Sequence, residues 1–229
     1  MKKHFTLIEL LIVVTVLMIL VSLLQPSFLS MTNKARTVTC QTNLKSQGSA
    51  LSIYISDHDH FFPIIANYSG LSGNKGNTRY YASNRLGLTD RPLNHYLGMD
   101  PKLSQCPSDL GDGLNKQYNK NLTTCYENFG TSYLVQFRGN PFRVKHLFHN
   151  TTPVSLNELP SLSNKLVTAD WPWHPNRTLS MPESRWHSPD SRSFNTLFAD
   201  GHTELFEFPL EYEEYSYYRK GYDPNHTWW

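Results

Sequence analysis

Residues 5–24 read FTLIELLIVVTVLMILVSLL, and this stretch decides the fold. Its twenty residues hold one charged side chain, Glu9, and as an α-helix they would span roughly 30 Å, about the thickness of a bilayer core. An ordinary secretory signal has a shorter apolar region without an acid, and small residues at a cleavage site after it. Here Gln25, Pro26 and Ser27 follow instead. The stretch therefore predicts a membrane-spanning helix.

The charges around this helix predict its orientation. Lys2 and Lys3 precede the apolar stretch, and the positive-inside tendency places that end in the cytoplasm and the rest of the chain outside. An ionised carboxylate inside a membrane costs about 3 kcal/mol unless it is paired or close to the interface. We therefore expect Glu9 to have a partner.

The apolar pattern changes after Pro26 from all-round to one-sided. Steps of three and four residues connect Phe28, Met31, Ala35, Val38, Leu44, Gly48, Leu51 and Ile55. This spacing predicts that the helix continues as an amphipathic rod over residues 5–58, roughly 80 Å in all. Its second half would bury one stripe against a head formed by residues 59–229.

The head carries turn and strand signals. Asp57-His58-Asp59-His60 predicts a solvated helix end, and the polar, Gly- and Asn-rich residues 67–91 predict a long surface loop. Asp200-Gly201 predicts a two-residue hairpin turn with positive φ at both positions. Strands are expected at 131–137, 166–169, 196–199 and 202–206. An antiparallel sheet packed on the long helix, an α+β fold, follows.

Composition narrows the function classes. The chain has 229 residues, 39% of them hydrophobic, and a formal charge of +2. Without Lys2 and Lys3 it has 19 basic and 19 acidic side chains, so the body is neutral. A neutral body lacks the positive field that phosphate backbones attract, and no nucleic-acid partner is expected.

Residues 2–10, KKHFTLIEL, resemble the processing motif of type IV prepilins and type II secretion pseudopilins. This resemblance implies a leader of residues 1–4 that a prepilin peptidase removes by cutting between His4 and Phe5, with N-methylation of Phe5. His4 stands where the family usually has Gly. Glu9 falls at the family's assembly glutamate, and Pro26 where many pilins carry a helix-kinking proline. The implied fold is pilin-like.

Short matches in the head extend the resemblance to a pseudopilin-like family with an H-X9-DG motif near its C-terminus. The last of these matches contains Asp200-Gly201, and the nearest candidate histidine, His187, is separated from Asp200 by twelve residues rather than nine. The matching segments are Cys40, Asn43-Leu44, Phe62-Pro63, Cys106 to Asp109, Thr131 to Tyr133 and Phe198 to His202.

Three cysteines allow one intrachain bridge. In an oxidising compartment Cys106 pairs with Cys125 or Cys40 pairs with Cys106, and the sequence leaves both pairings open.

Several other groups have the chemistry of a site. His187, Asp190, Asp200 and His202 are candidate metal ligands or an acid/base set, although the turn explains Asp200 and the following strand explains His202. Oxygen ligands on a flexible loop suit Ca²⁺, which makes Asp109 and Asp112 candidate calcium ligands. Residues 212–229 hold five Tyr and two Trp, residues favoured at interfaces.

These observations predict a structural pilin or pseudopilin subunit, not an enzyme, and without an obligatory cofactor. Its expected partners are copies of itself, other pilin-like subunits, the prepilin peptidase, the assembly machinery of the bacterial inner membrane and lipid. The expected location is the inner membrane, with a periplasmic head. The alternatives are a membrane-tethered protein that binds glycans or proteins through its aromatic tail, and an anchored hydrolase that uses His187 and Asp200.

Overall fold

The computed structural model describes residues 6–77, 86–116, 123–135, 147–148, 151–174 and 177–209. The chain divides into two compact units, residues 1–36 and residues 37–229. The first unit is helical from Leu7 onward, and the second, the head, contains a small sheet. The expected α+β layout is confirmed at this level. The aromatic tail expected at residues 212–229 lies outside the described residues.

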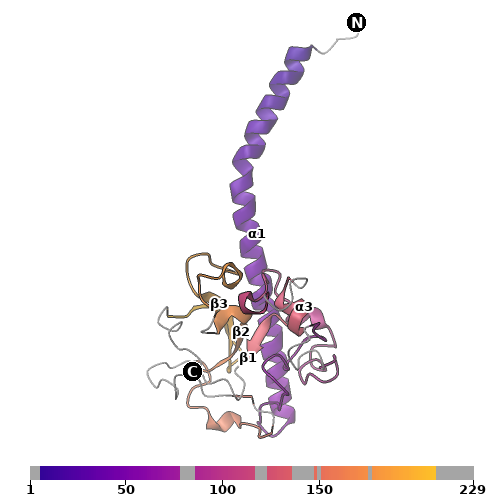
Figure 1. Ribbon diagram of the computed structural model, residues 1–229, viewed down its shortest axis with the longest axis vertical. Helices are drawn as coiled ribbons and strands as arrows, with labels where there is room; N and C mark the ends of the chain where they lie inside the picture. The colour runs from indigo at the N-terminus through magenta and orange to yellow at the C-terminus, as the bar shows by residue number, and fades with distance from the viewer. Residues whose placement is uncertain are drawn as a thin grey trace. The chain divides into compact units, whose positions relative to one another are not determined.

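Helix α1 (Leu7–Asp57) has 51 residues and belongs to both units (Figure 1). Within the head, α1 buries the side chains on one of its faces, and few of these side chains are polar. The buried residues of α1 are Cys40, Leu44, Gln47, Gly48, Ala50, Leu51 and Ile55. The apolar stripe predicted from the spacing is therefore a buried face from Cys40 onward, whereas Phe28, Met31 and Val38 are exposed.

The helix ends in solvent, as expected. Asp59 and His60 adopt φ values of 51° and 65°, in the left-handed region that cannot continue an α-helix. The His60 backbone N–H donates to the Ile55 carbonyl at 3.0 Å and so satisfies one of the free carbonyls at the helix end.

The other elements of the head are short. They are η2 (Pro101–Ser104), α2 (Gly113–Lys116), α3 (Cys125–Phe129), β1 (Tyr133–Val135), η3 (Leu156–Glu158), β2 (Leu166–Asp170), η4 (Trp171–Trp173), η5 (Pro182–Ser184), β3 (Ser193–Phe198) and β4 (Thr203–Glu207).

The four strands form one antiparallel sheet in the order β1-β2-β3-β4. All four expected strands are present, with shifted bounds. The hairpin between β3 and β4 is also present, but its loop differs from the prediction. Phe198 pairs with His202, so three residues form the loop, and of these only Gly201 has a positive φ, 84°. The Asp200 carboxylate accepts the His202 backbone N–H at 3.0 Å, which stabilises this longer turn.

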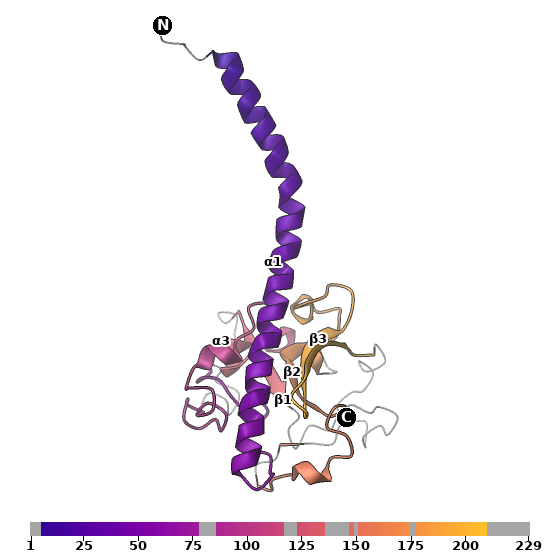
Figure 2. The same ribbon diagram turned by 180° about the vertical axis from the view of Figure 1, so that it is seen from behind.

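Both faces of the sheet are covered, which is why every residue of β1, β2 and β3 is buried. One face meets α1, which runs along the sheet in both views (Figures 1 and 2). A Cβ added at Gly48 of α1 would lie 2.7 Å from Leu197, and the Tyr133 hydroxyl donates to the Cys40 carbonyl at 3.3 Å. Side chains alternate along a strand, so the strand neighbours of Leu197 and Tyr133 face away from α1.

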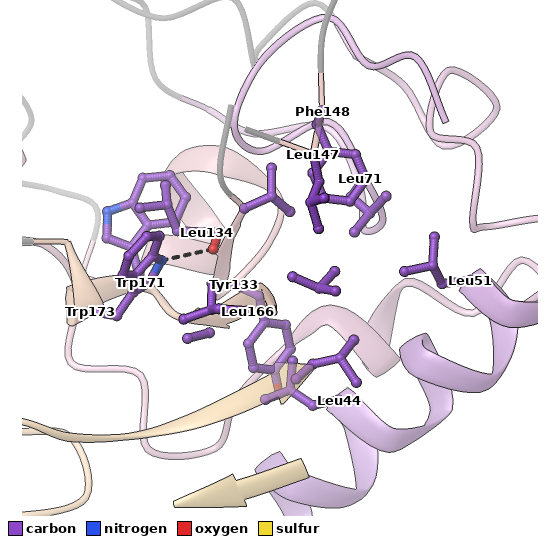
Figure 3. Close-up of a cluster of buried hydrophobic side chains, with 14 of the residues drawn as sticks. Leu44, Leu51, Leu71, Tyr133, Leu134, Leu147, Phe148, Leu166, Trp171 and Trp173 are labelled. Atoms are coloured by element: carbon purple, nitrogen blue, oxygen red, sulfur yellow. Dashed lines mark hydrogen bonds between the residues drawn. The ribbon is translucent and has the colours of Figure 1, made fainter. Parts of the chain in front are cut away.

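The apolar core continues on both faces. In the close-up Leu44 of α1 lies beside Tyr133, and Leu51, further along the helix, points toward the same cluster (Figure 3). On the far face the Trp173 indole N–H donates to the Leu134 carbonyl at 2.9 Å, and Phe208 packs against Trp173 and Phe194. The sheet is thus the middle layer of the head, between α1 and this aromatic layer.

The prediction of a surface loop is wrong for residues 67–77, because part of this segment is buried. They lack regular structure, as expected, but Asn67, Ser69 and Ser72 are buried. The fully buried Arg91 guanidinium donates to backbone carbonyls of Ser69, Ser72, Asn74 and Phe129. Polar sequence predicted exposure here, but one buried arginine supplies the hydrogen bonds that water would have made.

Candidate functional site

The apolar part of α1 is the first functional candidate. Of residues 6–36, only Thr32 is partly covered, and the rest are exposed. Glu9 is the only charged residue in this segment before Lys34. By length and composition α1 is able to cross a membrane. An exposed apolar surface of this extent is typical of a protein that meets lipid or another protein.

Glu9 has a local partner that the sequence analysis missed. The Thr6 backbone N–H and hydroxyl donate to Glu9 Oε2 at 2.8 and 2.7 Å, and the Glu9 N–H donates to Thr6 Oγ1 at 3.3 Å. This is a capping box, in which the side chains of the first and fourth residues satisfy each other's free backbone N–H groups. The T-x-x-E spacing at residues 6–9 was the available signal. Glu9 therefore helps to begin α1.

Of the other residues predicted to act in processing or assembly, only Pro26 is among the described residues. Pro26 lies inside α1, with helical residues on both sides. The processing residues His4 and Phe5, and the flanking Lys2 and Lys3, lie outside the described residues. Cleavage, methylation and orientation therefore stay predictions.

The disulfide joins Cys40 and Cys106, whose Cα atoms lie 5.0 Å apart. This is one of the two pairings that the sequence left open. The other, Cys106 with Cys125, is absent, because Cys125 begins α3 as a buried free thiol. The bridge connects α1 to the segment that follows η2, and so fixes the helix to the head. Burial raises the pKa of the Cys125 thiol well above its usual value, so this thiol is unreactive.

A buried polar cluster surrounds the disulfide. His187 Nε2 lies 3.1 Å from Asp170 Oδ2, 3.4 Å from Cys106 Sγ and 2.9 Å from Asn195 Nδ2. His187 Nδ1 lies 3.1 Å from the Thr37 hydroxyl of α1. The side chains of His187 and Asp170 are fully buried. One histidine therefore connects α1, the disulfide, β2 and β3.

This cluster corrects the predicted acid/base set. His187 contacts Asp170 rather than Asp200, and Asp190 is exposed. Asp200 and His202 form a separate, partly exposed pair with Oδ1 and Nδ1 2.6 Å apart. Across the described part of the chain, the four predicted residues do not form one group of metal-binding atoms. Asp170 was missed because nothing in its local sequence indicates the distant histidine.

The two candidate calcium ligands have other roles. Asp109 accepts the backbone N–H groups of Gly111, Cys125 and Tyr126 at 2.8–2.9 Å and the Ser132 hydroxyl at 2.6 Å. Burial raises the pKa of the Asp109 carboxyl to about 6, against the lowering effect of these hydrogen bonds. Its oxygens hold the start of α3 to Ser132, the residue before β1.

Asp112 is paired with a cation of the chain itself. It accepts the Trp171 indole N–H at 2.8 Å and Arg177 Nη2 at 2.5 Å. Burial favours a higher pKa, but the Arg177 charge and the hydrogen bonds from Arg177, Trp171 and the Leu114 backbone together outweigh it, so the pKa of Asp112 is lowered. With a guanidinium at this carboxylate, Asp112 is not available to Ca²⁺, and the calcium prediction is not supported by this geometry.

A search of family models, curated proteins and solved structures finds no match to this chain. Two features of the described residues have the character of functional sites: the exposed apolar segment with Glu9, and the buried cluster around His187.

Proposed function

We propose that this protein is a membrane-anchored structural subunit of the pilin or pseudopilin type, and that it performs no catalysis. The observation that carries the proposal is the exposed apolar segment of residues 6–36 with Glu9 as its one charge before Lys34. Each fully exposed large apolar side chain forgoes about 1.5–3 kcal/mol of burial, so this segment needs a cover of lipid or of other helices.

The proposed life cycle has two stages. In the precursor the segment spans the bacterial inner membrane, with the N-terminus in the cytoplasm and the head in the periplasm. A prepilin peptidase then cuts between His4 and Phe5 and methylates Phe5. In the second stage the apolar segments of many subunits bundle side by side into a fibre of the type II secretion or type IV pilus class, which the assembly machinery builds.

Glu9 has two proposed roles in this cycle. Its hydrogen bonds from Thr6 lower the cost of a carboxylate near the membrane surface, because the charge retains donors when water is lost. In the fibre it would pair with the α-amino group of Phe5 on a neighbouring subunit and so set the register. A buried pair adds specificity more dependably than stability.

The head supports a mechanical role. Its described core is continuous, and a disulfide and a helix–sheet interface fix it to α1. A pilin-like fold is part of the proposal, since a long helix on a small antiparallel sheet is compatible with it but is not specific to it.

Mass spectrometry of the protein purified from its native cell tests the proposal directly. We expect the mature chain to begin at Phe5 and to carry one methyl group on its α-amine. A chain that retains Met1 to His4 and is monomeric in the membrane would overturn the proposal. The matched control is a His4→Asp precursor, in which an acid next to the cut should block processing and leave the full-length chain.

A further inference from the structure

The buried cluster around the disulfide contains four groups that are common ligands of zinc. They are Cys40, Cys106, Asp170 and His187, and one ligand atom of each lies within 4.8 Å of all the others. The two sulfur-bearing residues are at most 1% exposed, and the side chains of Asp170 and His187 are fully buried. The four come from different parts of the head, so the tertiary fold gathers them.

The orientation of His187 is that of a metal ligand. Its Nε2 faces both Asp170 Oδ2, at 3.1 Å, and Cys106 Sγ, at 3.4 Å. Its other ring nitrogen, Nδ1, lies 3.1 Å from the Thr37 hydroxyl. Metal-binding histidines use one nitrogen for the ion and the other for a hydrogen bond that fixes the ring. Asp170 Oδ2 is likewise held, because it accepts the Asn195 backbone N–H at 2.7 Å.

The spacing of these atoms also fits. With ordinary zinc bond lengths, a tetrahedral site places its nitrogen and oxygen ligands about 3.3 Å apart and its nitrogen and sulfur ligands about 3.6 Å apart. The observed separations are 3.1 and 3.4 Å. The two sulfurs are bonded in the disulfide, and they would need to separate to about 3.8 Å. The Asn195 amide, 2.9 Å from Nε2, would have to turn away.

An independent observation indicates a missing partner at this place. Among the residues that the structure describes, Asp170 Oδ1 and Asn195 Oδ1 are buried and have no hydrogen-bond partner. A buried acceptor without a partner is costly, and a carboxylate more so than a neutral group. A cation at the cluster would neutralise Asp170 and occupy the Nε2 lone pair of His187.

We propose that the head binds one zinc ion through Cys40, Cys106, Asp170 and His187 when the disulfide is reduced. A dithiol reductant supplies two electrons and two protons to the disulfide and is itself oxidised to a disulfide, which leaves two thiols. Each thiol loses its proton as its sulfur binds Zn²⁺, His187 binds as the neutral imidazole and Asp170 as the carboxylate. The site then carries one net negative charge.

Two alternative cross-links are thus available at this site. In the oxidised protein a disulfide fixes Cys40 of α1 to the head, and in the reduced protein zinc does so. Two thiolates and an imidazole favour zinc over Mg²⁺ and Ca²⁺, which prefer oxygen ligands. The inference concerns the head alone and does not depend on the proposed assembly of the helix.

Cobalt is a suitable probe, because its absorption reports sulfur ligands. The full-length chain in detergent micelles is reduced with a dithiol, freed of reductant without oxygen and titrated with Co²⁺. We expect one Co²⁺ per chain, with thiolate-to-cobalt charge-transfer absorption that added Zn²⁺ abolishes. The oxidised chain should give no such absorption. Weak binding to the exposed histidines gives none either, so it does not imitate the result.

Matched variants identify the ligands. Cys125→Ser should keep the signal, because this thiol is not part of the cluster, whereas Cys106→Ser should lose it. His187→Ala and Asp170→Asn should each weaken Co²⁺ binding at least tenfold. If a variant does not fold, the wild type still decides: zinc should raise the melting temperature of the reduced chain and not that of the oxidised chain. Absence of the charge-transfer signal in the reduced wild type, or its loss in Cys125→Ser, would overturn the proposal.

Discussion

Gly48 of α1 lies against Leu197 of β3 so closely that an added Cβ would sit 2.7 Å from the Leu197 side chain and 3.4 Å from the Gly201 carbonyl. Lys45, one turn earlier, donates from Nζ to that same carbonyl at 2.8 Å. The β3–β4 turn therefore docks directly on the helix, and the Asp200-Gly201 motif has a packing role.

This close approach predicts the effect of a side chain at residue 48. Gly48→Val should destabilise the head by about 1–3 kcal/mol, because overpacking displaces Leu197 and the turn. Ser49→Val, on the exposed side of the same helical turn, is the control and should change stability by less than about 0.5 kcal/mol. Denaturant unfolding followed by tryptophan fluorescence measures both. Equal effects of the two variants would contradict the docking.

The Cys40–Cys106 bridge closes a loop with a sequence separation of 66, for which chain entropy gives a stabilisation of about 4 kcal/mol. Replacing both residues by Ala should lower the unfolding free energy by about 2–5 kcal/mol in metal-free buffer. Peptide mapping without reduction should recover the two cysteines as one linked pair. A linked pair of Cys106 and Cys125 would show that the pairing is wrong.

Buried Arg91 predicts a strong effect of a neutral substitution. Arg91→Met keeps much of the side-chain volume but removes the donor from four backbone carbonyls. The free energy of unfolding should therefore fall by about 3–5 kcal/mol. Burial lowers the pKa of Arg91 to about 10, which is still high enough to keep it charged at neutral pH. Arg185→Met, at an exposed arginine with one such bond, is the control and should cost less than about 1 kcal/mol. Thermal unfolding compares them.

The raised pKa of Asp109 predicts a pH dependence. Its folded-state value of about 6 exceeds the usual 3.8, so the folded state binds the proton more tightly than the unfolded state. The contribution of protonated Asp109 to the free energy of unfolding is complete below about pH 4 and is lost as the pH rises through about 6. The difference between the two pKa values corresponds to about 3 kcal/mol of unfolding free energy.

Asp109→Asn, which cannot ionise, isolates this effect. Unfolding free energies of the two proteins should diverge between pH 4 and pH 6, with the wild type becoming relatively less stable. A constant difference across that range would show that Asp109 does not titrate there.

Glu9 has a capping role and a proposed pairing role, which two substitutions separate. Glu9→Gln retains an oxygen that can accept from Thr6 but loses the charge, whereas Glu9→Ala loses both. If the charge pair sets the register, both variants should be processed and have folded heads, and neither should enter the fibre. Subunit incorporation is measured by immunoblotting of sheared fibres. Incorporation of Glu9→Gln at the wild-type level would assign Glu9 to helix capping alone.

Local patterns were sufficient for the long helix and for the existence of the four strands, but they did not predict α2, α3 or the short helices η2–η5. The apolar run with its later stripe predicted α1, and the Asp200-Gly201 turn signal between two short strand runs predicted the hairpin, because these signals depend on neighbours a few residues apart. The predicted length of the β3–β4 loop was too short by one residue, since the Asp200 side chain stabilises a longer turn.

Contacts between distant residues were not predictable. Residues 67–77 look like a surface loop until Arg91 is placed beneath their carbonyls. His187 looks like a partner of Asp200 until the fold brings Asp170, 17 residues before it, to 3.1 Å.

The sequence by itself determined that this protein has a long helix, whose apolar first part holds one acid, and a small antiparallel head, because periodicity and charge are properties of neighbouring residues. Only the tertiary structure decided which cysteines pair and that a histidine and an aspartate meet beside them. Such groups are brought together by the packing of α1 on the sheet, and no local pattern encodes that geometry.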